Sequence, residues 1–162
     1  MEHSDECPRV SYLRPQLIVW NDRRMDTNGS GGGLPPPMRR RLTDLHAGLL
    51  RLHKLLLDDE RAIYEKAHER TAPGKLLQLV IGDPQFAWLR RISELIVQID
   101  ELLESEGNAF APATELINQV RSLLAPAESD DEFARKYRDA LQRLPDAVLA
   151  HREVTAILSQ NN

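Results

Sequence analysis

Apolar residues recur at alternating intervals of three and four from Leu42 onward. The series is Leu42, Leu45, Leu49, Leu52, Leu56 and Ile63, with Asp59 at the one position where an apolar residue is missing. Because this spacing puts side chains on one stripe of a helix, it predicts a helix over about residues 39–70, roughly 45 Å long. Pro73 and Gly74 follow, and both residue types end helices. We expect this segment to be a long helix of a bundle.

A second periodic segment follows Gly82, Asp83 and Pro84, where Gly can end one helix, Asp can cap the next and Pro fits its first turn. Its apolar positions form two columns, which are Leu89, Ile92, Ile96, Ile99 and Leu103, and then Trp88, Leu95 and Leu102. Two columns widen the buried arc of a helix. We therefore expect this helix to be the most buried one, with a short apolar helix at about 75–82 before it.

Two more helical segments are expected after Gly107. Pro112 suits the first turn of a helix that Pro126 stops. The apolar positions of this helix are Leu116, Ile117, Val120, Leu123 and Leu124. Ser129 and Glu132 have the Ser-x-x-Glu spacing of a capping box, which predicts the start of a final helix.

The final helix is interrupted by a proline. Its first half carries Phe133, Tyr137, Ala140, Leu141 and Leu144, and Pro145 then breaks the pattern before it continues towards Leu158. The sequence contains no alternating runs bounded by turn residues, which would predict hairpins, and no internal repeat. These patterns together predict an all-α fold, a helical bundle of four main helices over residues 39–162.

Residues 1–38 differ in composition from the rest of the chain. They contain a Gly-rich tract at 28–33 and three consecutive prolines at 35–37. Gly-rich chain gains little by ordering, and Pro-Pro-Pro favours a stiff, extended spacer. We interpret residues 1–38 as a flexible, disordered N-terminal extension. An alternative is that the natural protein starts at Met25 or Met38.

The overall composition is that of a soluble globular protein, with 41% hydrophobic and 28% charged residues. No apolar run approaches the roughly 20 residues that a membrane helix needs, so we expect no membrane contact. Cys7 is the only cysteine, which excludes an internal disulfide framework, and no secretory signal is visible, so we expect a cytoplasmic location. The net charge of -4 gives no overall attraction to nucleic acid.

Polar residues interrupt the apolar arc of the first helix. At about 100° per residue, His46, His53 and Glu60 fall on one line of that helix, and His151 interrupts the last helix in a similar way. A buried imidazole needs a hydrogen-bond partner, so we expect carboxylates or carbonyls opposite these positions, with Asp100 as one candidate. The plain interpretation is a buried polar stripe of structural histidines.

A metal or small-ligand site is the alternative interpretation of these residues. It requires His53, Glu60, His68 and His151 to converge with carboxylates such as Asp100. His46 and His53 lie seven residues apart, roughly 10 Å along the helix axis, so they cannot bind one ion together. Glu65 and His68 match the Glu-x-x-His element of di-iron bundles, but the second copy that such sites need is missing. We expect no cofactor and no enzymatic activity.

Aromatic and basic residues near residue 86 have the composition of a protein interface. Phe86, Trp88, Arg90 and Arg91 stand together at a helix start, although such aromatics also close the ends of bundles. The basic run Arg39–Arg41 is a candidate for nucleic-acid binding, but three basic residues before an acidic bundle are typical of a solvated helix start. We expect a protein partner or a homo-oligomer and no binding to nucleic acid.

Part of the chain resembles a family of small uncharacterised bacterial proteins. The likeness covers about residues 42–104 and is carried by LHKLLLDDERAIYE at 52–65, LLQL at 76–79 and DPQFAWLRRISELIVQIDE at 83–101. The resemblance implies a bacterial, cytoplasmic protein and brings no catalytic residues with it. Our prediction from the sequence is a non-enzymatic protein–protein interaction module, and the alternative is a bundle that binds a metal or small ligand through His and carboxylate side chains.

Overall fold

The computed structural model describes residues 33–68, 78–79, 81–107, 109–125 and 131–160. They form five α-helices and one 3-10 helix, residues 78–79 and 81–82 are also helical, and no strand occurs among the described residues. In chain order these are α1 (Pro36–Ala67), η1 (Pro84–Leu89), α3 (Arg90–Glu104), α4 (Phe110–Leu124), α5 (Glu132–Arg143) and α6 (Pro145–Leu158). The predicted all-α fold is confirmed for this part of the chain. Ser129, Cys7, most of the predicted extension and part of the short helix at 75–82 lie outside the described residues.

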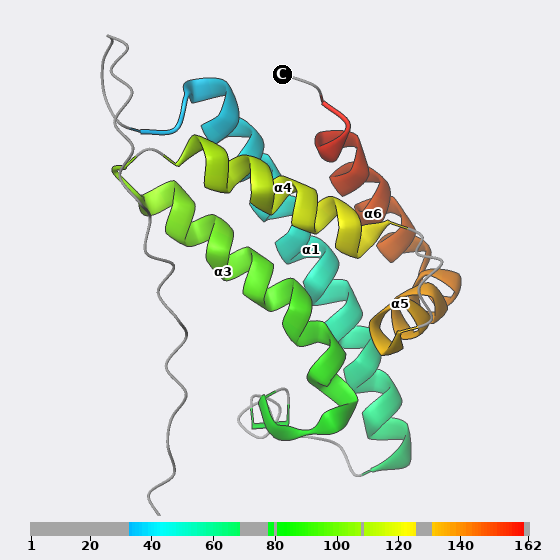
Figure 1. Ribbon diagram of the computed structural model, residues 1–162. Coiled ribbons are helices and arrows are strands. Elements are labelled where there is room, and N and C mark those ends of the chain that lie inside the picture. The colour runs from blue at the N-terminus through cyan, green and yellow to red at the C-terminus, as the bar shows by residue number, and fades with distance from the viewer. Residues whose placement is uncertain (1–32, 69–77, 80, 108, 126–130, 161–162) are drawn as a thin grey trace, which may run out of the picture. The chain divides into compact units, whose positions relative to one another are not determined.

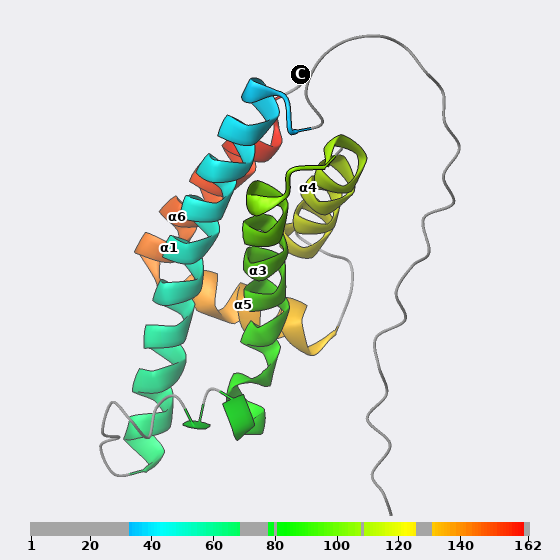
Figure 2. The same cartoon turned by 90° about the vertical axis from the view of Figure 1, so that its left-hand side faces the viewer.

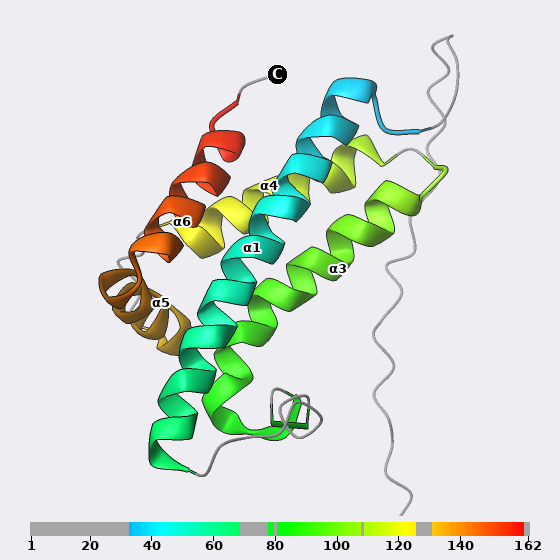
Figure 3. The same ribbon diagram turned by 180° about the vertical axis from the view of Figure 1, so that it is seen from behind.

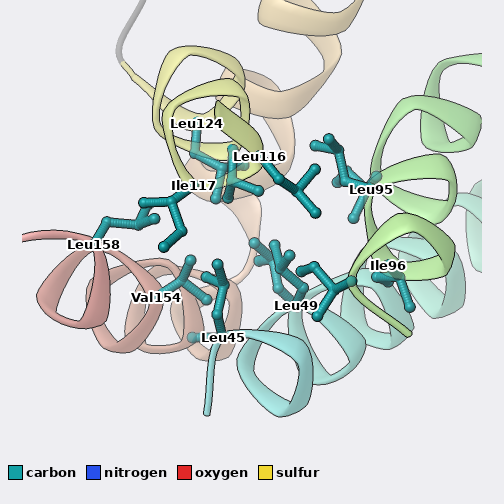
Figure 4. Close-up of a cluster of buried hydrophobic side chains, with 14 of the residues drawn as sticks. Leu45, Leu49, Leu95, Ile96, Leu116, Ile117, Leu124, Val154 and Leu158 are labelled. Atoms are coloured by element: carbon teal, nitrogen blue, oxygen red, sulfur yellow. The ribbon is translucent and has the colours of Figure 1, made fainter. Parts of the chain in front are cut away.

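Four of the helices surround one core. α1 packs against α3 and α6, and α4 packs against α3 and α6 on the opposite side of the core (Figures 1 and 2). Figure 4 shows side chains from all four helices pointing towards one another, including Leu49 of α1, Leu95 of α3, Ile117 of α4 and Val154 of α6. α5 packs on α6 and η1. The core is therefore a four-helix arrangement with a fifth helix added to it.

The predicted number of main helices is too small by one. The final helix is two helices, because Leu144 adopts an extended conformation (φ -119°, ψ 97°) between α5 and α6. Pro145 is the first residue of α6, where its missing N–H removes no hydrogen bond. The proline thus starts a new helix instead of bending a continuous one.

Helical and buried residues begin before residue 39, the predicted start of the bundle. Pro36 and Pro37 form the first turn of α1, where a fixed φ suits the helix, so the three prolines are not an extended spacer throughout. Leu34 and Met38 are 6% and 3% exposed and belong to the core. The packed part of the chain therefore reaches at least to Leu34.

The apolar stripe of α1 changes position near its end. Leu42 to Leu56 are buried as predicted, but the next buried position is Glu60, which is 5% exposed, while Asp59 and Ile63 are partly exposed. A helix has 3.6 residues per turn, so buried positions spaced on average 3.5 residues apart drift around the helix. The next buried position therefore lies four residues after Leu56, and not three. A carboxylate, not Ile63, therefore continues the buried stripe.

Two helix starts also differ from the prediction. Asp83 caps its segment as expected, accepting a hydrogen bond from Gln85 N at 2.8 Å, but the first turns form the 3-10 helix η1 before α3 begins at Arg90. α5 begins at Glu132 with Asp131 as its cap, because Asp131 Oδ1 accepts from Ala134 N at 2.8 Å. The capping box predicted from Ser129 is wrong, since Glu132 is the first helical residue and not the third.

Candidate protein interface on α1 and α3

Two polar pairs join α1 to α3. Nε2 of His46 lies 3.0 Å from Asp100 Oδ1, and Ser93 Oγ lies 3.0 Å from His53 Nε2. His46 and His53 are seven residues apart on α1, and Ser93 and Asp100 are seven residues apart on α3. The pairs occur in opposite order along the two helices, so α1 and α3 are antiparallel. We name these four residues the polar seam. The structure thus places two members of the predicted stripe, His46 and His53, along the α1–α3 contact and brings Asp100 to His46.

The two histidines of the polar seam differ in their surroundings. His46 Nε2 is buried and makes no hydrogen bond of good geometry, so its contact with Asp100 is an ion pair only when the imidazole is protonated. Burial lowers the pKa of His53, which favours a neutral ring that shares a hydrogen bond with the Ser93 hydroxyl. Ser93 was not predicted from the sequence, because serine on a helix is usually solvent-exposed.

Glu60 is held by side chains from two other elements. Trp88 Nε1 donates to Glu60 Oε2 at 3.3 Å, and Lys136 Nζ of α5 lies 3.7 Å from Glu60 Oε1. Lys136 also donates to Gln85 O at 2.8 Å, which ties α5 to η1. Sequence reasoning missed Lys136, because nothing in the local pattern of α5 distinguishes it from an exposed lysine. This cluster satisfies a buried carboxylate and joins three elements.

His151 pairs with an aromatic side chain of α5. Tyr137 Oη lies 2.8 Å from His151 Nδ1. Burial lowers the pKa of His151 and raises that of Tyr137, so a protonated hydroxyl faces a neutral imidazole. Both residues line a cavity of about 70 Å³, well below the roughly 300 Å³ that ligand pockets start from. We interpret the pair as a structural contact between α5 and α6.

The residues of the predicted metal site are not brought together. His53, Glu60 and His151 have the separate partners described above, and His68 stacks on Tyr64 with ring centroids 4.2 Å apart. Glu65 accepts from Arg61 Nε at 2.8 Å. Among the described residues, no three His, Cys, Asp or Glu side chains are grouped so that they can hold a metal ion. The expected convergence is therefore not found in this part of the chain.

The predicted interface residues at η1 are divided between core and surface. Phe86 and Trp88 are buried, which leaves their side chains little area for a partner. Arg91 donates to Asp131 at 2.9 Å and lies over the Phe133 ring, 5.2 Å from its centroid. Arg90 is exposed and donates to a backbone carbonyl, that of Ile81, at 3.0 Å. Of the two aromatic and two basic candidates, only the arginines remain accessible.

The basic run at the start of α1 caps two other helices. Arg39 Nη1 donates to Leu103 O at 2.7 Å, in the last turn of α3. Arg41 donates to Ile157 O and Leu158 O, in the last turn of α6. Carbonyls in the last turn of a helix lack the donors that the helix interior provides, and cations at helix C-termini are favourable. Ile157 O also accepts from Gln160 N at 3.3 Å. Burial, and secondly the neighbouring Arg121, lower the pKa of Arg41.

Exposed apolar side chains lie on either side of the polar seam. Leu50 of α1 is 46% exposed and Val97 of α3 is 54% exposed. Leu50 lies between His46 and His53 along its helix, and Val97 lies between Ser93 and Asp100. The two therefore stand at the same level, on the side of the seam that faces away from the core. Leu50 and Val97 were not predicted from the sequence, because they lie outside the apolar series of their helices. Which such residues share a surface depends on which helices are neighbours in the fold.

We name the solvent-facing side of α1 and α3 the outer face. In Figure 3 these two helices lie side by side in front, and α4, α5 and α6 lie behind or beside them. The middle of the outer face carries Leu50 and Val97, and the borders of this face carry exposed charged side chains. Near one end of α3, a surface hollow of about 450 Å³ is lined by residues that include Ile81, Arg90 and Ser93. An apolar centre with a charged border is the composition of a protein-binding surface.

The described helices include none with both the length and the apolar character that a bilayer crossing requires. Comparison with protein-family models, with curated proteins and with solved structures finds no match for this chain. The resemblance to small bacterial proteins over residues 42–104 therefore stays a prediction.

Proposed function

We propose that this protein is a non-enzymatic interaction module that binds another polypeptide through the outer face of α1 and α3. One observation carries the proposal, namely that Leu50 and Val97 are exposed at the same level of a helix pair that no described helix covers. The apolar face of an amphipathic helix is a partner that can cover two such neighbouring apolar side chains.

The energetics of the pair agree with a binding role. Covering a Leu or Val side chain that is about half exposed gains roughly 1 kcal/mol each, which is useful for association and contributes little to the isolated bundle. Below them, His53 and Ser93 already share a hydrogen bond, so a partner that covers this pair leaves neither group unpaired. Arg90 borders the same face and can contact acidic groups of the partner.

Site-specific photo-crosslinking in the native host tests this proposal. Leu50 and Val97 are each replaced by a photo-reactive phenylalanine analogue, and Leu149 of α6, which is 52% exposed, receives the same group as a matched control. We expect one discrete adduct of the same mass from positions 50 and 97 and none of that mass from position 149. Equal labelling at all three positions, or no adduct at 50 and 97, would reject the outer face as a binding surface.

A further inference from the structure

We propose that the partner of the outer face is a basic amphipathic helix, which places an apolar stripe on Leu50 and Val97 and a row of lysine or arginine side chains along the outer side of α3. This inference rests on the proposed function and names the chemistry of the partner. It is carried by the charges that remain unpaired around the apolar centre and by the spacing of two glutamates on α3.

The cations nearest the apolar centre are already paired. Arg51, next to Leu50 in the chain, contacts Glu153 of α6 at 2.8 Å. Lys54, one turn further along α1, pairs with Asp58 of the same helix. Both side chains therefore interact with anions of this chain and offer little attraction to an acidic partner.

The anions nearest the apolar centre are unpaired. Glu94 and Glu101 of α3 lie three residues before and four residues after Val97, and both are exposed. Within the described part of the chain, neither glutamate forms an ion pair. Asp100, next to Glu101, contacts His46 and is exposed as well. The α3 side of the outer face is therefore negative around Val97, so it attracts cations and repels the phosphates of nucleic acid.

Two other cations lie towards the ends of the face. Arg40 is ten residues before Leu50 and Arg90 is seven residues before Val97, or roughly 15 and 10 Å along their helices. The Debye length is about 8 Å at physiological ionic strength, so both charges are largely screened from the centre. Arg90 is one turn from Glu94, but it donates to Ile81 O at 3.0 Å and forms no ion pair with that glutamate among the described contacts. At its end of the face, Arg90 can contact an acidic group of the same partner helix.

The two glutamates match the repeat of a helix that lies along α3. Residues seven apart on an α-helix stand on nearly the same side, about 10 Å apart along the axis. Glu94 and Glu101 have this separation. At about 100° per residue, Val97 lies roughly 40° to 60° nearer to the α1 side than either glutamate.

This geometry specifies the sequence pattern of the partner. A helix nearly parallel to α3 with Lys or Arg at positions i and i+7 can contact both carboxylates. Its residues at i+3 or i+4 lie between these cations, on the same side of the helix. Apolar residues at those positions then cover Leu50 and Val97, which gives an apolar centre with a charged border.

We expect the complex to be reversible and dependent on salt. One helix on a face of two helices covers less area than a standard interface of roughly 800 Å² per partner, which indicates a dissociation constant on the order of 10–100 μM. The ionic contacts lie at the border, where each is worth at most about fivefold in affinity. Raising the salt concentration should therefore weaken binding several-fold without abolishing it.

Fluorescence anisotropy of labelled peptides with the full chain tests the proposal. The basic probe is a peptide of about 18 residues, mainly alanine and glutamine, with a leucine stripe at helical spacing and two lysines seven residues apart beside the stripe. The acidic probe has glutamate at the two lysine positions, and the scrambled probe has the composition of the basic probe without its stripe. At low salt we expect the basic probe to bind about tenfold more tightly than either of the others.

Charge reversal separates the two glutamates from the overall charge of the chain. Glu94→Lys with Glu101→Lys should invert the preference, so that the acidic probe binds better than the basic one, because the border contacts change sign. Glu115→Lys with Asp139→Lys makes the same change in net charge at exposed positions of α4 and α5 and should keep the preference for the basic probe within about threefold. Unfolding cannot invert a preference.

The apolar centre is tested by a neutral polar substitution. Leu50→Gln should weaken binding of the basic probe about fivefold, because the leucine side chain is no longer covered. Leu149→Gln, on a similarly exposed leucine of α6, should change the affinity by less than about twofold. Equal effects of the two substitutions would place the probe on another surface and overturn the proposal.

The remaining outcomes distinguish this proposal from the interaction function. A native chain that binds the basic and acidic probes equally overturns the basic helix, and so does a preference that Glu115→Lys with Asp139→Lys inverts as well. If the crosslinks from positions 50 and 97 contain a segment without a basic amphipathic helix, or a second copy of this chain, the interaction function stands and this occupant is wrong. The absence of both crosslinks rejects the outer face as a binding surface and this inference with it.

Discussion

Gly48 of α1 and Val154 of α6 lie so close that a Cβ atom added to the glycine would be 2.9 Å from Val154 Cγ2. The glycine is inside a helix, where glycine normally costs about 1 kcal/mol relative to alanine. Its presence there lets the two helices approach each other closely. The ion pair of Arg51 with Glu153, at 2.8 Å, crosses the same contact.

The close approach predicts that the effect of alanine at position 48 changes sign with residue 154. Gly48→Ala should destabilise the native protein by about 1–3 kcal/mol, because the new methyl group overpacks against a β-branched side chain in a buried helix contact. With Val154→Ala already present, the same change should be stabilising by up to about 1 kcal/mol through helix propensity. Chemical denaturation of the four proteins of this double-mutant cycle measures both effects. A stabilising Gly48→Ala in the native background would contradict the close approach.

Two partly buried histidines predict a loss of stability on mild acidification. Burial lowers the pKa of His53 and of His151 in the folded chain, so between pH 7 and 5 the unfolded chain binds more protons than the folded one. The free energy of unfolding should therefore fall as the pH drops through the ordinary histidine range. The double variant His53→Gln and His151→Gln should show a flatter dependence than the native protein, and His68→Gln, at an exposed position, should not.

The sequence predicted local features well, because they depend on nearby residues. The stripe from Leu42 to Leu56, the two columns of α3, the cap by Asp83 and the break at Pro145 all follow from helix periodicity or from the chemistry of single residues. The buried polar stripe already included Glu60, but the three-four series put its next position at Asp59, because 3.5-residue spacing drifts around a 3.6-residue helix.

The candidate interface was only partly predictable. The line of His46 and His53 was predictable, because polar residues that interrupt an apolar arc can be recognised within one helix, whatever helix packs against it. Ser93 and Val97 became visible only once α3 was known to run antiparallel beside α1 with a defined register. Lys136 was missed for the same reason, since its partner Glu60 belongs to a distant helix. Register between helices is a property of tertiary packing, which periodicity does not specify.

The Glu60 cluster predicts an asymmetry between losing one charge and losing both. Lys136→Met should destabilise the protein by about 1–2 kcal/mol, because a buried carboxylate then lacks its cation, although the lysine is partly exposed and solvent offsets part of the loss. Adding Glu60→Gln should restore most of that stability, because the amide oxygen can still accept from Trp88 Nε1. Lys66→Met, at an exposed position of α1, serves as the control and should change the unfolding free energy by less than about 0.5 kcal/mol.

The basic run predicts different effects for two adjacent arginines. Arg41→Met should lower the free energy of unfolding by about 1–2 kcal/mol, because it removes hydrogen bonds from Arg41 to the terminal carbonyls of α6. Arg40→Met, at an exposed position, should change it by less than about 0.5 kcal/mol. Thermal unfolding of both variants at one ionic strength makes the comparison. Arg41 Nη2 and Arg121 Nη2 both donate to Leu158 O, so Arg121→Met should also lower the free energy of unfolding, but by less than Arg41→Met. Equal effects of Arg40→Met and Arg41→Met would contradict a capping role for the run.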